Sequence, residues 1–203
     1  SLSTEMQELH ISLWETKRAP VPLLHDIFSC IRGLEMLEII LPLLSERQMN
    51  TILRDVMLPR LSLLVAEVPH RSLISFLLCH TCITTFTMSS CSSSGTICPL
   101  SAVTSTGSIM ELSGPMSCVP YLIDGNPVTR LKLSWEDHRY FELLLHHVGE
   151  GTSRITHLDL EFVDQDAQFI IRLARAVPFL YRLRLREVSS VSSQHEKCAT
   201  VSH

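Results

Sequence analysis

With 203 residues, the chain is long enough for one domain or for one continuous array of repeats. Hydrophobic residues make up 45% of it, so it can bury a sizeable core. A formal net charge of −4 excludes a strongly basic, nucleic-acid-binding composition, and we expect no nucleic-acid partner. The seven cysteines are an odd number without regular spacing, which argues against a disulfide framework. Reduced thiols are typical of the cytoplasm or the nucleus, where we expect the protein to be located.

The start of the chain, SLSTEMQELH, has neither a basic region nor an apolar core, so it predicts no secretory signal. The chain does not begin with methionine, and we interpret it as a fragment or a processed form. Residues 72–110 contain no Asp, Glu, Lys or Arg. Their dense apolar part covers only 73–86, whereas a membrane-spanning helix needs about 20 apolar residues. We therefore expect no membrane segment and predict a buried helix followed by a strand.

A pattern of three apolar residues recurs in the N-terminal half, with two residues between the first and second and one between the second and third. Alternation with period two places the last two apolar residues on one face of a β-strand. Each copy therefore predicts a strand whose apolar face must be buried by its neighbours. The copies are Met6/Leu9/Ile11, Leu34/Leu37/Ile39, Leu58/Leu61/Leu63 and Ile83/Phe86/Met88.

Apolar residues at helical spacing lie between these predicted strands. The first stripe covers residues 24–31 and follows two prolines, and the third covers 73–78. The second covers 49–56 and follows Ser45 and Gln48, whose spacing is that of a capping box. Strands and helices are thus expected to alternate along the chain.

The middle of the chain interrupts this regularity. Residues 89–108 are dominated by Ser, Thr, Gly and Cys, and we expect a long surface loop there, with a degraded repeat as the alternative. A partial strand at Ile109 and Leu112, a short apolar run at 119–123 and a turn at 124–127 follow. This repeat is expected to be shortened.

The C-terminal half carries the clearest copies of the pattern, at Val128/Leu131/Leu133, Ile155/Leu158/Leu160 and Leu180/Leu183/Leu185. Helical stripes lie between them at 140–148, which we expect Gly149 to end, and at 169–177, after Asp164 and Asp166. Central leucines about 25 residues apart predict a leucine-rich-repeat solenoid, an α/β fold with parallel strands on the concave face and helices on the convex face. We expect it to be irregular and to cover 1–188, with a polar, disordered tail at 189–203. An ordinary α/β domain with crossover helices is the alternative.

These strands and the segment MELSGPMSCVPYLIDGNPVTRLKL resemble the repeat region of fungal F-box-like proteins with leucine-rich repeats. The resemblance covers residues 1–188. It implies substrate-recognition repeats of a ubiquitin-ligase receptor, whose F-box docks the adaptor of a cullin ligase. No Leu-Pro-led F-box pattern is found near the start, so we expect the adaptor as a partner only if an F-box lies outside this chain.

Metal and enzyme motifs are weak. Cys79-His80-Thr81-Cys82, followed by Cys91 and Cys98, is the best zinc candidate, but the second pair is spaced by seven. We interpret these cysteines as buried small hydrophobes and expect no metal. His146 and His147 are helix neighbours that point in different directions, so they cannot easily share a metal. No Walker sequence, GxGxxG or G-x-S-x-G is present. We therefore expect neither an enzyme nor a cofactor.

Residues that alternate with the core positions are predicted to line the concave face, where solenoids bind partners. We expect a protein partner there, and a merely solvated face is the alternative. The function predicted is substrate recognition for a ubiquitin ligase, with a free-standing repeat scaffold as the alternative. The candidate partner-binding residues are Glu8, His10, Glu38, Ser62, Thr87, Lys132, Asp159 and Arg184.

Overall fold

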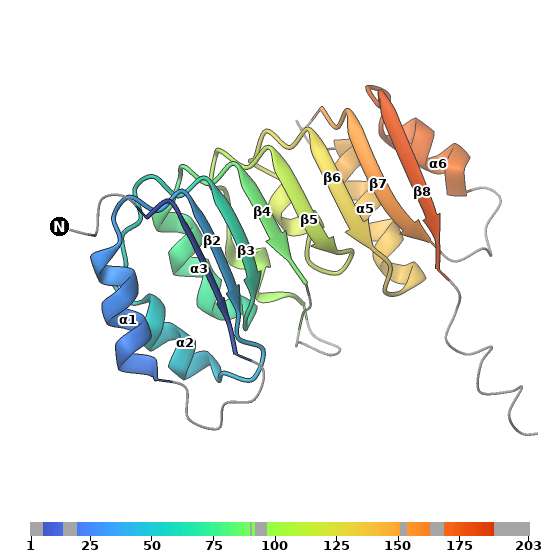
Figure 1. Cartoon of the computed structure of the whole chain (residues 1–203). Helices are drawn as coiled ribbons and strands as arrows, with labels where there is room; N and C mark the ends of the chain where they lie inside the picture. The colour runs from blue at the N-terminus through green and yellow to red at the C-terminus, as the bar shows by residue number, and fades with distance from the viewer. Residues whose placement is uncertain are drawn as a thin grey trace, which may run out of the picture.

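The computed structural model describes residues 6–13, 20–89, 91, 97–150, 154–162 and 169–188. Its strands form a single eight-stranded sheet in which they follow one another in sequence order, and every neighbouring pair is parallel (Figure 1). The strands are β1 (Glu8–Ser12), β2 (Met36–Ile40), β3 (Leu63–Glu67), β4 (Thr85–Met88), β5 (Glu111–Pro115), β6 (Arg130–Ser134), β7 (His157–Phe162) and β8 (Arg182–Glu187).

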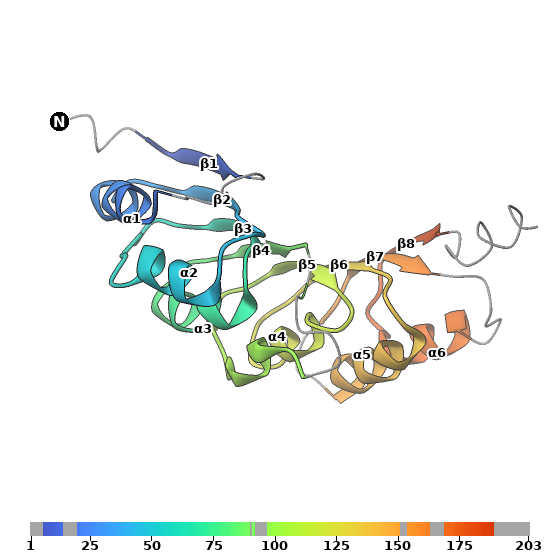
Figure 2. The same cartoon turned by 90° about the horizontal axis from the view of Figure 1, so that it is seen from below.

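All of the helices lie on one side of this sheet, and the sheet bends so that its other face is concave (Figure 2). A doubly wound sheet would carry helices on both faces. The sequential strand order and the one-sided helices therefore confirm the predicted leucine-rich-repeat-like α/β solenoid. The helices are α1 (Val21–Cys30), α2 (Glu46–Leu53), α3 (His70–Cys79), the 3-10 helix η2 (Pro99–Ala102), α4 (Pro120–Ile123), α5 (His138–Glu150) and α6 (Phe169–Ala176).

The core is built from rows of side chains that run across the strands. One row takes the same register position from every strand, and its inner members are buried between the sheet and the helices. This is the physical reason for the repeat, because each strand can bury its apolar face only against the next. The row consists of Leu9, Leu37, Leu64, Phe86, Leu112, Leu131, Leu158 and Leu183.

The third repeat is displaced from its predicted frame. Leu64, and not Leu61, pairs with Leu37, and Ala66 pairs with Ile39. The true triplet is therefore Leu61, Leu64 and Ala66, and Leu63 turns toward the open face of the sheet. The sequence assignment was wrong because Ala66 is a small residue that can fill an inward position without standing out as apolar.

The last strand also differs from expectation. Leu131, Leu158 and Leu183 lie on adjacent parallel strands, as predicted. Leu158 is 1% exposed, but Leu183 is 39% exposed, so the prediction that all three are fully buried was wrong for Leu183. Because β8 is the terminal strand of the sheet, no further repeat among the described residues covers it.

The described part of the predicted loop at 89–108 is not a plain surface loop. Helix η2 lies in it and packs against α3 and α4, and Leu100 and Val103 are buried. A turn then follows α4, where the Asn126 side-chain amide donates to the Leu122 carbonyl at 2.9 Å and its oxygen accepts from the Thr106 hydroxyl at 2.6 Å. The repeat from β4 to β5 thus carries η2 in place of a full helix, and the predicted shortened repeat is the next one, in which only α4 lies between β5 and β6.

Two helix ends test predictions that were made from the local sequence. The capping box is confirmed, since Gln48 N–H donates to the Ser45 hydroxyl at 3.4 Å and Ser45 N–H donates to the Gln48 side chain at 3.0 Å. Gly149 was expected to end its helix, but α5 continues through Glu150. The predicted disordered tail at 189–203 and the acidic helix start at 164–166 lie outside the described residues.

Candidate functional site

The concave face of the sheet presents one continuous row of outward side chains. Each member pairs in register with the next, so the row crosses all eight strands, and the helices leave this face uncovered (Figure 2). Side chains that stand on one face of adjacent strands lie close enough to act on one ligand together. The row consists of His10, Glu38, Val65, Thr87, Ser113, Lys132, Asp159 and Arg184.

The structure brings six of the eight predicted residues into this row: His10, Glu38, Thr87, Lys132, Asp159 and Arg184. Glu8 lies in the neighbouring outward row, paired with Met36. Ser62 was placed wrongly, because it precedes β3 and its hydroxyl donates to the Glu35 carbonyl at 3.2 Å.

Val65 and Ser113 belong to the row and were missed by the sequence analysis. Val65 was lost when the third repeat was assigned to the wrong frame. Ser113 was omitted because only a partial strand was recognised around Leu112. The repeat spacing applied through Leu112 could have found it, since Ser113 follows that leucine as Lys132 follows Leu131.

The C-terminal half of the row is hollowed. One hollow of about 470 Å³ lies over β4 to β8 and is lined by Thr87, Glu111, Arg130 and Arg182 among others. A second, of about 270 Å³, extends toward the carboxyl ends of the same strands and includes Arg184 and Arg186. Ser113, Lys132 and Asp159 line both hollows, so the two are adjoining parts of one depression.

Charges in this depression are only partly neutralised. Arg130 forms an ion pair with Glu111 at 2.7 Å, and Arg186 forms one with Glu161 at 3.2 Å. Within the described part of the chain, no hydrogen bond or ion pair involves the side chains of Lys132, Asp159, Arg182 and Arg184. Three cations against one carboxylate leave an excess of positive charge over β6 to β8 for a ligand to meet.

The N-terminal half of the face has the opposite character. Glu38 pairs there with His10, while Glu8 and Glu67 have no cationic partner among the described residues. Leu63 and Val65 add half-buried apolar surface between them. The concave face is therefore acidic and apolar at β1 to β3 and basic at β6 to β8.

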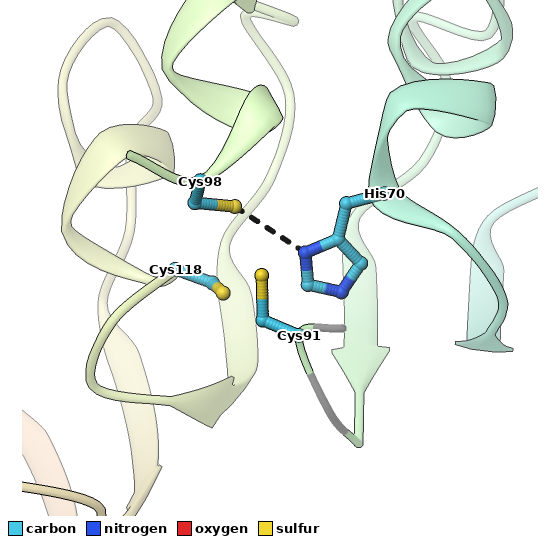
Figure 3. Close-up of side chains that lie close together, drawn as sticks. All are labelled: His70, Cys91, Cys98 and Cys118. Atoms are coloured by element: carbon cyan, nitrogen blue, oxygen red, sulfur yellow. Dashed lines mark hydrogen bonds between the residues drawn. The ribbon is translucent and has the colours of Figure 1, made fainter. Parts of the chain in front are cut away.

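A second group of candidate side chains lies beyond the carboxyl ends of β3, β4 and β5, where the sequence did not predict one. The side chains of His70, Cys91, Cys98 and Cys118 point toward one another (Figure 3). Their nitrogen and sulfur atoms all lie within 4.8 Å of one another, and His70 Nδ1 is 3.3 Å from Cys98 Sγ. The cluster contains two of the cysteines of the weak zinc motif, joined by two residues from other repeats.

The rest of that motif is dispersed. Cys79 and Cys82 are exposed, so the expectation that they are buried hydrophobes was wrong. His80 is buried, and both of its ring nitrogens bond to backbone groups. Their spacing in the chain had suggested a common site, but the end of α3 directs the three side chains to different surroundings.

The thiols of Cys98 and Cys118 have different pKa values. A hydrogen bond from the Cys118 thiol lowers the pKa of the Cys98 thiol, and the adjacent His70 lowers it further. The same bond raises the pKa of the Cys118 thiol, and burial adds to that effect. Cys98 is therefore the member of this pair that loses its proton first.

The neighbouring histidines of α5 do not converge. His147 Nδ1 lies 2.6 Å from the Asp124 carboxylate, and its ring meets the His146 ring edge-on, with centroids 5.5 Å apart. The pair at His147 and Asp124 ties α5 to the turn after α4.

No protein-family model, curated protein or solved structure matches this chain. Among the helices that the structure describes, none combines the length and the apolar character that crossing a membrane would require.

Proposed function

We propose that this chain is a protein-binding module whose concave sheet face holds the partner. The observation that carries the proposal is the register row from His10 to Arg184, which places polar or charged side chains from seven of the eight strands on one uncovered face that is hollowed over β4 to β8. Solenoids use such a face because a curved sheet can contact an extended length of partner surface. The row has mixed charge, which suits a protein partner better than nucleic acid.

The charge distribution supports one orientation of the partner. Lys132, Arg182 and Arg184 lie over β6 to β8 without partners among the described residues, so an acidic part of the partner fits there. The Glu8 and Glu67 end fits a basic or apolar part. Complementary charge of this kind raises association rates and excludes partners bound in the reverse direction.

The finer proposal is substrate recognition for an F-box-like ubiquitin-ligase receptor. Its support is the resemblance of the strands and of segment 110–133 to the repeat region of such proteins. The alternative is a free-standing repeat scaffold with no role in ubiquitination. The two differ in the adaptor: a receptor needs an F-box to bind it, and no Leu-Pro-led F-box pattern is found near the start of this sequence.

The test is a quantitative pull-down with three baits. They are the wild type, the concave-face variant Lys132→Glu with Arg184→Glu, and the control variant Arg47→Glu with Arg139→Glu. The control residues are exposed on α2 and α5, so both variants make the same change in net charge on opposite faces.

Partners lost by the concave-face variant and kept by the control support the proposed face. Identical profiles for all three baits refute it. A second arm mixes the purified chain with purified ligase adaptor. Direct binding of the adaptor would show that this chain carries an adaptor-docking surface, contrary to our proposal, whereas ubiquitination of a captured partner by the full-length receptor would favour the receptor role.

A further inference from the structure

Three consecutive repeats each place a potential metal ligand just beyond the carboxyl end of their strand. His70, Cys91 and Cys118 each lie three residues beyond the last residue of their strand, which is β3, β4 and β5 respectively. Neighbouring parallel strands are about 4.8 Å apart, so residues just beyond their ends can come close together. Cys98, which precedes the first residue of η2, supplies a fourth side chain from between β4 and β5 (Figure 3).

The geometry is close to that of a tetrahedral zinc site. Zinc bonds of about 2.3 Å to sulfur and about 2.0 Å to nitrogen place neighbouring ligand atoms about 3.5–3.8 Å apart. In the structure the four candidate atoms lie within 4.8 Å of one another, and the His70 Nδ1 to Cys98 Sγ distance is 3.3 Å. A contraction of about one ångström or less would bring them onto one ion.

The burial of His70 is a second, independent observation. His70 is 3% exposed, and the hydrogen-bond partner of its Nδ1 is the Cys98 thiol, at 3.3 Å. A thiol is a weak partner for a buried ring nitrogen, and a zinc ion on Nδ1 would replace it with a strong bond. The Nε2 atom has no partner among the described residues, and the ion would leave it so. The other fully buried histidine, His80, has both ring nitrogens bonded to the backbone, which is what a purely structural histidine requires.

We propose that His70 Nδ1 and the sulfur atoms of Cys91, Cys98 and Cys118 bind one zinc ion. Thiolate and imidazole ligands favour zinc over magnesium or calcium, and four protein ligands leave no open position for catalysis. Three thiol protons leave for solvent as three sulfur–zinc bonds form, and nothing is oxidised or reduced. Cys98 and Cys118 are buried, while the half-buried Cys91 marks the side from which the ion enters.

The site has a structural purpose at this point of the solenoid. Between β4 and β6 the described residues provide only the short helices η2 and α4 on the convex side, whereas the flanking repeats provide the longer helices α3 and α5. An ion held by residues of three repeats would tie β3, β4 and β5 together where helix packing is weakest. Binding energy at such a site is folding energy, because the unfolded chain does not hold the four ligands together.

The test uses the full chain, purified without chelator, with zinc measured by elemental analysis and cobalt(II) as a spectroscopic probe. We expect one zinc per chain. Cobalt added to the chelator-stripped protein should give the visible bands of a tetrahedral complex and thiolate charge-transfer absorption in the near ultraviolet.

Variants assign the ligands. Cys91→Ser is the mildest change, because Cys91 is half-buried, and it should weaken zinc binding at least tenfold and reduce the charge-transfer intensity by about a third, since one of three thiolates is lost. The control, Cys79→Ser with Cys82→Ser, removes two exposed thiols of the same chain and should leave both readouts unchanged. Circular dichroism checks that each variant remains folded.

Several results would overturn the proposal. One is a folded wild-type chain that gives no tetrahedral cobalt spectrum and takes up no zinc on titration. Another is a metal spectrum that survives Cys91→Ser but disappears in the Cys79 and Cys82 control. A third is a disulfide among Cys91, Cys98 and Cys118, found by thiol counting in protein purified without oxidant, because a disulfide removes the thiolates that the ion needs.

Discussion

The Nε2 atom of His80 accepts a hydrogen bond from the backbone N–H of Leu58 at 3.0 Å. The Nδ1 atom of the same ring lies 2.7 Å from the Phe76 carbonyl and donates to it, and the ring stacks on Phe76 with centroids 4.0 Å apart. A neutral imidazole with its proton on Nδ1 satisfies both bonds. His80 thus joins the end of α3 to the start of the turn before β3, and protonation of Nε2 would break the bond to Leu58.

The free energy of unfolding should therefore decrease as the pH is lowered, and His80 should account for part of that decrease. Burial lowers the pKa of His80 below its ordinary value, so below about pH 6.5 the unfolded chain binds a proton more readily than the folded chain. The His80 contribution is fully present above about pH 6.5 and is lost as the pH falls through the folded pKa, at up to about 1.4 kcal/mol per pH unit. Urea denaturation of the wild type and His80→Ala from pH 7.5 to about 5 measures the difference. Parallel curves for the two proteins would contradict the prediction.

His80→Ala should also destabilise the protein at neutral pH. The substitution leaves the buried Leu58 N–H without its acceptor, at a cost of about 1–3 kcal/mol. The exposed neighbour offers a control, because Cys79→Ala removes a side chain of the same helix end without touching this network. Equal urea midpoints for the two variants at pH 7.5 would show that the bond to Leu58 contributes nothing measurable.

The equivalent leucines of β7 and β8 should differ in their contribution to stability. Leu158→Ala creates a cavity in the middle of the core row and should lower the free energy of unfolding by about 2–5 kcal/mol. Leu183→Ala removes the same atoms from the terminal strand, where the side chain is 39% exposed, and should cost about half as much or less. Chemical denaturation measures both. Equal losses would mean that further chain covers β8 in solution.

Periodic leucines made most of this fold predictable, since each strand carries its own pattern and the pattern has one physical cause. The errors lie in two strands that depart from the general pattern, each for a reason of its own. Ala66 fills an inward position without a large side chain, so the third frame slipped, and Leu183 has the pattern but lacks a following repeat. Patterns within one strand cannot report either circumstance.

The cluster around His70 could not be predicted from the leucine pattern, for a different reason. Its four members come from three repeats, and only the folded strands show that three of them follow the ends of neighbouring strands. Counted from the inward residue that ends each strand pattern, Cys91 lies three residues after Met88, but His70 lies four after Ala66 and Cys118 four after Gly114. No single spacing within the repeats therefore finds all three residues.

Gly114 should be difficult to replace. A Cβ atom built there would lie 2.4 Å from Met88 Cγ and 2.9 Å from the Met88 carbonyl oxygen, so Met88 occupies the space that a side chain would need. Gly114→Ala should destabilise the protein by about 1–3 kcal/mol, because the neighbouring backbone cannot move freely. Gly149→Ala is the control: it lies in α5 with nothing within 4 Å, and alanine should be neutral or stabilising there. Thermal melts of both variants measure the two effects. An unchanged melting temperature for Gly114→Ala would show that β4 and β5 can separate slightly.

Binding at the concave face should respond to single charges in opposite directions. Lys132 and Asp159 are register partners on β6 and β7, and neither has an ion-pair partner among the described residues. If an acidic part of the partner lies over β6 to β8, Lys132→Gln with Arg184→Gln should weaken binding by about tenfold, equivalent to about 1.4 kcal/mol. Asp159→Asn removes the one opposing charge and should strengthen binding.

Calorimetry with a partner identified by pull-down measures both effects. The affinity of the wild type should decrease when the salt concentration is raised from about 0.1 to about 0.3 M, because exposed charges are screened. Stronger binding by the Lys132 and Arg184 variant would show that the partner presents cations to this half of the face, and would reverse the orientation that we propose.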